Sequence, residues 1–244
     1  MFPLDHNDLF PSGTVRMNGV KFFGERKTDQ IVEYAAAMIE ADGGALEPLF
    51  EQLLESRNGQ HYTVENFTIY NEGGIGGEIC GEPVLLGTLN FLQDMGVEIP
   101  EGTMVNQAVY AAIDGQLCAV YAISSAKMRS AAAGLVTLCG YRKMTVVKLP
   151  GDFMLTESFL RSKFNIKSRR VVFPQWEDGV LLSRFQPDPH EPVLALTTRS
   201  ELVSAAYAVT GARALRQSTR LGVAIHLIGG ILGLLIMAAL ALLG

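Results

Sequence analysis

Residues 221–243 read LGVAIHLIGGILGLLIMAALALL and contain no aspartate, glutamate, lysine or arginine. At 1.5 Å per residue these 23 residues make a helix of about 34 Å, long enough to cross a hydrocarbon core of about 30 Å. Three arginines precede the stretch at helical spacing, namely Arg213, Arg216 and Arg220. Because basic residues beside a span favour the cytoplasmic side, we expect a single-pass protein of the cell membrane with its N-terminal region in the cytoplasm.

Two other interpretations of this stretch are weaker. A buried helix of a large soluble domain is disfavoured by the length, the absence of charge and the arginine boundary. A cleaved signal peptide is excluded by the position of the stretch. Inside it, Gly229 and Gly233 form a GxxxG pair, where a second copy of the chain or a transmembrane pump subunit could pack, although such pairs also arise by chance. His226 could face a partner helix or a transported ion, or reach the interface as a neutral side chain.

Composition restricts the function of the rest of the chain. The 244 residues carry a formal net charge of −5, and lysines and arginines gather only near residues 163–170 and before the span, which argues against nucleic acid as a partner. The three cysteines lie far apart in apolar runs, at Cys80, Cys118 and Cys139. We therefore expect reduced, buried thiols in a cytosolic protein, with neither a disulfide framework nor a metal site.

The N-terminal 56 residues combine a strand pair with two helices. Residues 1–24 are predicted to form a strand, a turn and a second strand, with Asp5 and Asp8 just before the turn. Two carboxylates at a strand end could hold Mg²⁺ or include a nucleophile, but aspartate is also common at turns for hydrogen-bonding reasons. Apolar periodicity predicts helices over residues 28–41 and 46–56, packed as a pair.

A glycine-rich segment follows a predicted strand at residues 62–70. Residues 71–81 read NEGGIGGEICG, with five glycines in nine residues, and pair with residues 83–87 in a hairpin that turns at Gly81 and Glu82. Such a backbone could approach a phosphate or a purine closely. A plain glycine-rich turn is the other interpretation. The pattern is not a dinucleotide-binding fingerprint, because no helix opens directly after it.

The second half of the chain alternates strands and helices. Residues 107–125, QAVYAAIDGQLCAVYAISS, read as two apolar strands joined by a type I′ turn at Asp114 and Gly115. Helices are predicted at 126–139 and 154–164, and strands at 145–149 and 170–173, with a further short strand at 193–196. This β-α-β-α-β order predicts a parallel sheet that binds ligands at the carboxyl ends of its strands, where Asp5 and Asp152 lie. Residues 201–220 are expected to continue as a helix toward the membrane.

Three of these stretches resemble the cytosolic half of P-type ATPases, most closely the heavy-metal branch: GIGGEICGEPVLLGTLNFLQDMGVEIP (74–100), QAVYAAIDGQLCAVYAI (107–123) and TVVKLPGD (145–152). The resemblance implies a haloacid-dehalogenase-like phosphorylation domain, a nucleotide-binding insertion, and ATP and Mg²⁺ as cofactors. It implies that Asp5 is the phosphorylated aspartate and that Asp152 ends the family's T-G-D motif. The positions that match the nucleotide-domain pattern are Gly74, Gly76, Gly81 and Gly87.

The chain also departs from the family pattern. The sequence after Asp5 lacks the lysine, threonine and glycine of D-K-T-G-T-L-T, and Pro150 replaces the threonine of T-G-D. Glu47 stands where the family's S-x-H-P motif places a histidine against adenine, and Ser125 stands where an aspartate usually opens the next helix. The family's G-D-G-x-N-D is absent before the membrane span, so the metal that neutralises charge in phosphoryl transfer lacks a ligand.

The sequence therefore predicts an α/β fold and leaves three functions open. The first is a degenerate P-type ATPase-like unit that binds nucleotide or regulates a pump with impaired turnover. The second is an active unit, in which ATP phosphorylates Asp5 and Asp8 or Asp152 supplies the missing magnesium ligand. The third is a membrane-anchored interaction scaffold without nucleotide. The abrupt start before Asp5 also fits the C-terminal piece of a longer membrane protein.

Four regions follow from this interpretation of the sequence. The predicted division is a phosphorylation-domain-like core at 1–24 and 106–205, a nucleotide-domain-like insertion at 25–105, a basic juxtamembrane helix at 206–220 and a transmembrane helix at 221–243.

Overall fold

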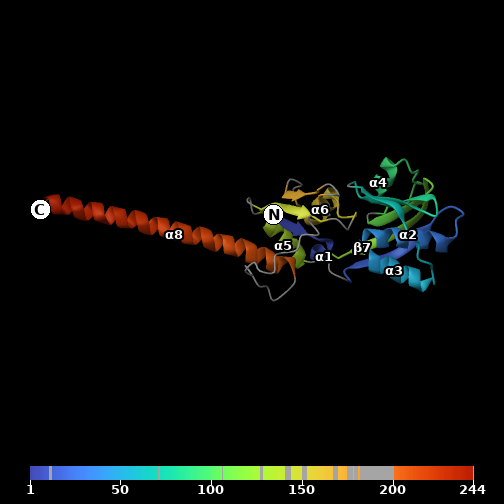
Figure 1. Cartoon of the computed structure of the whole chain (residues 1–244), viewed down its shortest axis with the longest axis horizontal. Helices are drawn as coiled ribbons and strands as arrows, with labels where there is room; N and C mark the ends of the chain where they lie inside the picture. The colour runs from blue at the N-terminus through green and yellow to red at the C-terminus, as the bar shows by residue number, and fades with distance from the viewer. Residues whose placement is uncertain are drawn as a thin grey trace.

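Two β-sheets and one long C-terminal helix make up the computed structural model of the chain (Figure 1). The structure describes residues 1–10, 13–70, 72–105, 107–126, 129–140, 144–149, 153–166, 170–174, 178, 181 and 201–243. The strands are β1 (Phe2–Leu4), β2 (Val15–Phe22), β3 (Glu65–Tyr70), β4 (Gly74–Ile79), β5 (Glu82–Gly87), β6 (Ala108–Ile113), β7 (Gln116–Ser125), β8 (Val146–Lys148) and β9 (Val171–Val172). The helices are α1 (His6–Leu9), α2 (Thr28–Asp42), α3 (Glu47–Ser56), α4 (Leu89–Asp94), α5 (Arg129–Gly140), α6 (Glu157–Phe164) and α8 (Leu202–Leu243).

The larger sheet has six antiparallel strands in the order β2-β7-β6-β5-β4-β3. The turn between β6 and β7 has positive φ at both Asp114 (52°) and Gly115 (72°), as a type I′ turn requires, so the predicted hairpin is confirmed. The turn between β4 and β5 has the same signature at Cys80 and Gly81. These two-residue turns fix the register of four neighbouring strands.

Helices cover both faces of this sheet. α2 and α3 pack together on one face and α4 lies on the other (Figure 1). On the α2 face the ring of Tyr121 lies 4.8 Å from that of Phe50, and the Tyr121 hydroxyl donates to the carbonyl of Ile31. On the α4 face Phe91 and Tyr110 are almost fully buried. The sheet therefore separates two apolar clusters.

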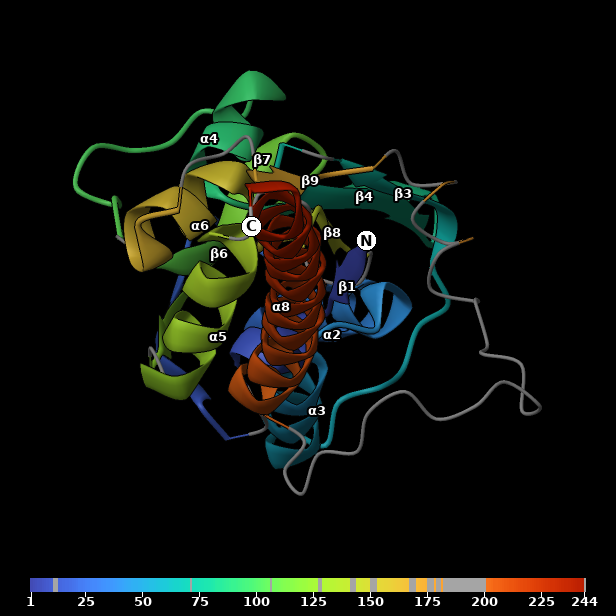
Figure 2. The same cartoon turned by 90° about the vertical axis from the view of Figure 1, so that its left-hand side faces the viewer.

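The smaller sheet is parallel, with the order β1-β8-β9 and Phe2 opposite Val146 (Figure 2). The N–H of Leu149 donates to the carbonyl of Leu4 at 2.8 Å. The chain leaving β8 therefore starts beside Asp5, which directly follows β1. The carboxyl edge expected to carry the site is present in this sheet.

The expected β-α-β-α-β order is present as β7, α5, β8, α6 and β9, but the expectation that it forms one parallel sheet is wrong, because only β8 and β9 of these strands lie in that sheet. β6 and β7 belong to the antiparallel sheet, because the turn at Asp114 and Gly115 makes them a hairpin. β2 joins the same sheet and pairs with β7 from Val15 opposite Ser125 onward, so β1 and β2, the two strands predicted within residues 1–24, lie in different sheets. In the described residues the parallel sheet contains only β1, β8 and β9. The strand predicted at 193–196 lies outside these residues.

The long helix α8 joins the predicted juxtamembrane and membrane-spanning segments into one element of 42 residues. Its first turns dock on α5, where Leu202 and Ala206 are buried and the backbone runs close to Gly134. The rest projects away from both sheets (Figures 1 and 2). The apolar side chains along it are exposed. Its most apolar window has a mean hydropathy of 2.5 and is not buried at all, so this helix has the length and composition to cross a membrane.

Candidate functional site between the two sheets

Asp5 lies at the carboxyl edge of the parallel sheet, between the end of β1 and the first residue of α1. Its exposed side chain is the N-cap of α1 and accepts from the N–H of Asn7 at 3.1 Å. Asp8 Oδ2 in return accepts from the N–H of Asp5 at 2.8 Å. Both predicted carboxylates therefore have a structural role as a reciprocal capping box, which satisfies two N–H groups at the start of the helix.

The pKa of Asp8 is raised above its ordinary value of 3.8, chiefly because the half-buried carboxylate loses solvation. The hydrogen bond from the Asp5 backbone acts in the opposite direction, and the neighbouring Asp5 charge adds to the rise. The folded protein thus binds this proton more tightly than the unfolded chain does.

Asp8→Asn should change the pH dependence of stability. The stabilising effect of the raised pKa is complete below pH 3.8 and is lost as the pH rises through the folded-state pKa. Asparagine keeps an oxygen that can accept from the Asp5 N–H but carries no charge. We therefore expect the thermal stability of the wild type, relative to Asp8→Asn, to fall as the pH rises above 3.8 and through the folded-state pKa. Asp94→Asn, at an exposed position ending α4, is the matched control. A constant difference between wild type and Asp8→Asn across this range would contradict the assignment.

Asp152, the second predicted catalytic residue, lies outside the described residues, as do Pro150 and Gly151. Leu149 is the last described residue before them and is bonded to Leu4. The chain that leads to Asp152 therefore leaves the parallel sheet at the same edge that carries Asp5.

The predicted glycines serve the packing of the sheet. Gly74 and Gly87 are cross-strand partners, and a β-carbon on either would collide with the ring of Phe91. At Gly76 a β-carbon would lie 3.1 Å from both Leu85 Cδ2 and a ring carbon of Tyr70, whereas Gly81 occupies the turn at the far end of the strand with φ of 80°.

Glu47 is not brought together with these glycines. It is the exposed first residue of α3, which packs with α2 on one face of the sheet. The β-carbon directions of Gly74 and Gly76 lie on the other face, toward Phe91 and Tyr70.

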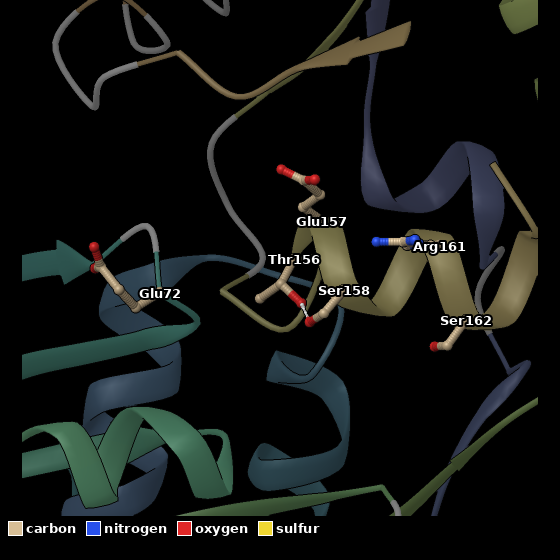
Figure 3. A pocket seen from close by; sticks show the side chains of 6 residues that line it. All are labelled: Glu72, Thr156, Glu157, Ser158, Arg161 and Ser162. Carbon is tan, nitrogen blue, oxygen red and sulfur yellow. Dashed lines mark hydrogen bonds between the residues drawn. The ribbon is translucent and has the colours of Figure 1, made fainter. Parts of the chain in front are cut away.

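A hollow of about 600 Å³ lies between the glycine-rich hairpin and α6 (Figure 3). A second hollow of about 370 Å³ adjoins it, because both are lined by Thr156, Ser158 and Ser162 of α6. Arg161 and Glu157 complete the α6 wall of the larger hollow, and Glu72 lies on the opposite side. We call the two hollows together the inter-sheet cleft.

Two helix caps and the glycine-rich hairpin meet at this cleft. Thr88 is the N-cap of α4 and accepts from the N–H of Phe91, and Thr156 is the N-cap of α6 and accepts from the N–H of Phe159. Gly73, with φ of 100°, fits between them. A β-carbon there would lie 2.7 Å from Thr156 Cγ2 and 3.2 Å from Thr88 Cγ2.

The cleft residues were missed in the sequence analysis. Each threonine carries a local signal, since it precedes a helix that begins one residue later. Thr88 and Thr156 both lie beside Gly73, although they are 68 residues apart in the sequence. No local sequence pattern predicts this proximity.

The lining of the cleft is polar and carries charges of both signs, because the carboxylates of Glu72 and Glu157 lie among hydrogen-bond donors. Its lining offers three hydroxyls from α6, the hydroxyl of Thr88, the amide of Asn90 and the guanidinium of Arg161. A preformed metal centre is not visible in the described part of the chain, where no group of three or more His, Cys, Asp or Glu side chains could hold an ion. Mg²⁺ commonly needs only one or two carboxylates plus the phosphates of its substrate. Asp5 and Asp8, the predicted metal ligands, line neither hollow, whereas Glu72 and Glu157 line the larger one.

Neither a protein-family model nor a curated protein sequence matches the chain. Solved structures that are similar to it include nucleotide-binding and catalytic domains of copper- and zinc-transporting P-type ATPases. The N-domain of the copper-transporting P-type ATPase HMA6 matches with 20% identity and a TM-score of 0.38, covering 46% of this chain and all of that one. The catalytic domain of the CPx-ATPase CopB-B matches with 14% identity and a TM-score of 0.41, covering 75% of this chain and 64% of that one. A zinc-transporting PIB-type ATPase matches with 16% identity and a TM-score of 0.37, covering 74% of this chain and 30% of that one.

Proposed function

We propose that this protein is a membrane-anchored, cytosolic P-type ATPase-like unit that binds a magnesium nucleotide in the inter-sheet cleft with impaired turnover. The observation that carries the proposal is the meeting of Gly73 with Thr156. It joins the glycine-rich hairpin, which resembles the nucleotide-domain pattern, to the helix that follows the T-G-D-like segment. A ligand in this cleft touches both of the stretches on which the resemblance rests.

The charges around the cleft favour the magnesium complex over the free nucleotide. Glu72 and Glu157 place two carboxylates against the single guanidinium of Arg161 in the larger hollow (Figure 3). A free triphosphate would meet a net negative site, whereas a divalent cation neutralises part of its charge. Ser162 Oγ donates its one hydrogen to the carbonyl of Phe159, and Ser158 Oγ is hydrogen-bonded to Thr156 Oγ1, so a phosphate oxygen has to compete with these partners for the hydroxyl protons.

The proposal of impaired turnover rests on the hydrogen bonding of Asp5 and on the residues that follow it. The side chain caps α1, and the residues beside it lack the lysine and threonine of the family motif. Phosphoryl transfer depends on groups that neutralise charge and position the phosphate, so their absence lowers the rate more than the affinity.

The proposed division of the chain keeps a nucleotide-domain-like insertion at 25–105 within a phosphorylation-domain-like core at 1–24 and 106–205. The sheet of the insertion also includes β2, β6 and β7. The N-terminal region is proposed to lie in the cytoplasm, with Gly229 and Gly233 as the contact to a second copy or to a transmembrane pump subunit.

An active phosphoryl-transfer unit is the second candidate. It is favoured by one observation: Asp5 is exposed at the carboxyl edge of a parallel sheet, beside the segment that leads to Asp152. Sites in such sheets lie at this edge. The nucleotide-free scaffold remains as an outcome of the test below.

Calorimetric titration of Mg-ATP into the full-length protein in detergent tests the proposal. We expect binding in the micromolar to millimolar range, and at least tenfold weaker binding when EDTA removes the magnesium. Arg161→Gln should weaken Mg-ATP binding about tenfold, since it removes a charge-assisted hydrogen bond. Arg16→Gln, exposed on β2 away from the cleft, is the matched control.

The outcomes separate the three functions. Binding that Arg161→Gln weakens, without acid-stable phosphate incorporation, supports the proposal. Incorporation that Asp5→Asn abolishes, with binding retained, selects the active enzyme. A folded protein that releases no heat at any Mg-ATP concentration selects the scaffold.

A further inference from the structure

Lys163 links the two sheets beside the points where the chain crosses between them. Its ammonium donates to the carbonyl oxygen of Ser125 at 2.5 Å and to Ser125 Oγ at 2.6 Å. Ser125 ends β7 in the six-stranded sheet, whereas Lys163 belongs to α6, which lies in the chain between β8 and β9 of the parallel sheet. A single side chain therefore spans from one sheet system to the other.

Ser125 is a firmly held anchor for this link. It pairs with Val15 across the strands, and the next residue, Ala126, donates its N–H to the carbonyl of Thr14 at 3.0 Å. Gln107 adds two longer side-chain hydrogen bonds to Ser125, both at 3.4 Å. The chain passes between the two sheets twice, before β2 and after β7. Both passages meet the six-stranded sheet at the Val15–Ser125 pair, beside the group that Lys163 bonds.

The rest of the Lys163 environment is aromatic. The ammonium lies 5.5 Å from the ring centroid of Phe10 and 5.6 Å from that of Phe159, and these two rings meet edge to face. Phe10 is the C-cap of α1, the helix that Asp5 begins. The cation–π contacts add to two charge-assisted hydrogen bonds, so the ammonium is held on several sides.

The same helix forms a wall of the inter-sheet cleft. Thr156, Ser158 and Ser162 line the cleft, and Lys163 points from a different side of α6 toward Ser125. α6 has eight residues, about 12 Å of helix, so Lys163 and the serines that line the cleft belong to one short element. Whatever fixes Lys163 to Ser125 therefore fixes the distance between the α6 wall and the glycine-rich hairpin.

We propose that Lys163 is a positioning residue that sets the width of the inter-sheet cleft through its bonds to Ser125. Its effect on nucleotide affinity rests on the proposed function, whereas its effect on the distance between the sheets does not. Loss of the link is expected to let the two sheets sample a wider range of separations, so that the cleft must be ordered anew each time a ligand binds.

The test measures the distance between the sheets in the full-length protein by pulsed electron paramagnetic resonance. One spin label is placed on the exposed Cys80, at the turn between β4 and β5, and the other on Val136→Cys, an exposed position on α5. Cys118 and Cys139 are buried and are not expected to react. Lys163→Met keeps the apolar stem and removes the ammonium. We expect it to broaden the distance distribution at least twofold and to weaken Mg-ATP binding at least fivefold.

Lys21→Met is the matched control, because Lys21 also lies over an aromatic ring, that of Phe23 at 5.0 Å, but on β2. It should leave the distribution and the affinity unchanged. Ser125→Ala removes only the hydroxyl acceptor and should give an intermediate broadening, which keeps the test valid if Lys163→Met does not fold. A distribution in Ser125→Ala and Lys163→Met as narrow as in the wild type overturns the inference. If the wild type binds no Mg-ATP, the proposed function fails, and the distance measurement still decides the role of Lys163.

Discussion

Gly74→Ala is expected to lower the free energy of unfolding by about 3 kcal/mol, the upper part of the usual range for overpacking a core. The added methyl group would overlap the ring of Phe91, which is 1% exposed and has no free space to enter. The ring of Phe91 cannot shift toward the opposite strand, because Gly87 of that strand packs against the same ring. Denaturation of the full-length protein in detergent, followed by near-ultraviolet circular dichroism, measures the difference.

Gly19→Ala is the matched control for this change. Gly19 also lies in a strand of the same sheet, but no atom lies within 4 Å of the position that a β-carbon would take. We expect an effect within about 0.5 kcal/mol there. In a Phe91→Leu background the cost of Gly74→Ala should shrink, and a double-mutant cycle gives the coupling between the two positions. Equal losses at Gly74 and Gly19 would falsify the packing explanation.

The packing role of Gly74 changes how the glycine-rich segment is interpreted. The sequence alone left open a ligand-binding backbone and a plain structural turn. Phe91 accounts for Gly74 and Gly87 without any ligand, so these two matches to the nucleotide-domain pattern are weak support for a nucleotide site. Gly73 is the glycine that borders the cleft, and the family pattern did not single it out.

Local signals predicted the elements of the fold well. The type I′ turn at Asp114 and Gly115, the helix pair over residues 28–56 and the long C-terminal helix all appear where patterning placed them. Each of these depends on residues close in sequence, such as turn residues with positive φ or apolar residues repeated along one helix face.

Strand partners were harder to predict. The strand β2 pairs with β7, and Val15 and Ser125 are 110 residues apart in the sequence. Apolar strands such as β6 and β7 look alike whether they lie in a parallel or an antiparallel sheet, because both faces are buried in each case. The type I′ turn between them is the local feature that requires an antiparallel pair.

The candidate site shows the same limit. Asp5 and Asp8 are neighbours in sequence, so their closeness is predictable, and the structure explains it by the capping box D-x-x-D. The cleft depends on Thr88, Thr156 and Gly73, which only tertiary packing brings together. The contact between Lys163 and Ser125 likewise depends on tertiary packing, because nothing in the local sequence of either residue predicts the other as its partner.

Leu232→Arg combined with Leu235→Arg is expected to abolish stable membrane anchoring. Both leucines are exposed near the centre of the apolar segment of α8, one turn apart. An arginine at the centre of a span costs roughly 2.5–3.5 kcal/mol on insertion scales, so the pair costs about 5–7 kcal/mol. Since 1.4 kcal/mol is tenfold, that shifts the partition out of the membrane by about four orders of magnitude.

Extraction of membranes with alkaline carbonate measures the effect, with the wild type retained in the pellet and the double variant released. Leu215→Arg is the matched control, because Leu215 is equally exposed on α8 but lies before the apolar segment, between Arg213 and Arg216. Leu215 lies on the other side of the helix from Arg213 and Arg216, but a charge there still falls in the basic segment before the span, which should lie in the headgroup region, so anchoring should persist. Release of the wild type by carbonate would mean that the exposed apolar surface of α8 is covered by protein rather than by lipid.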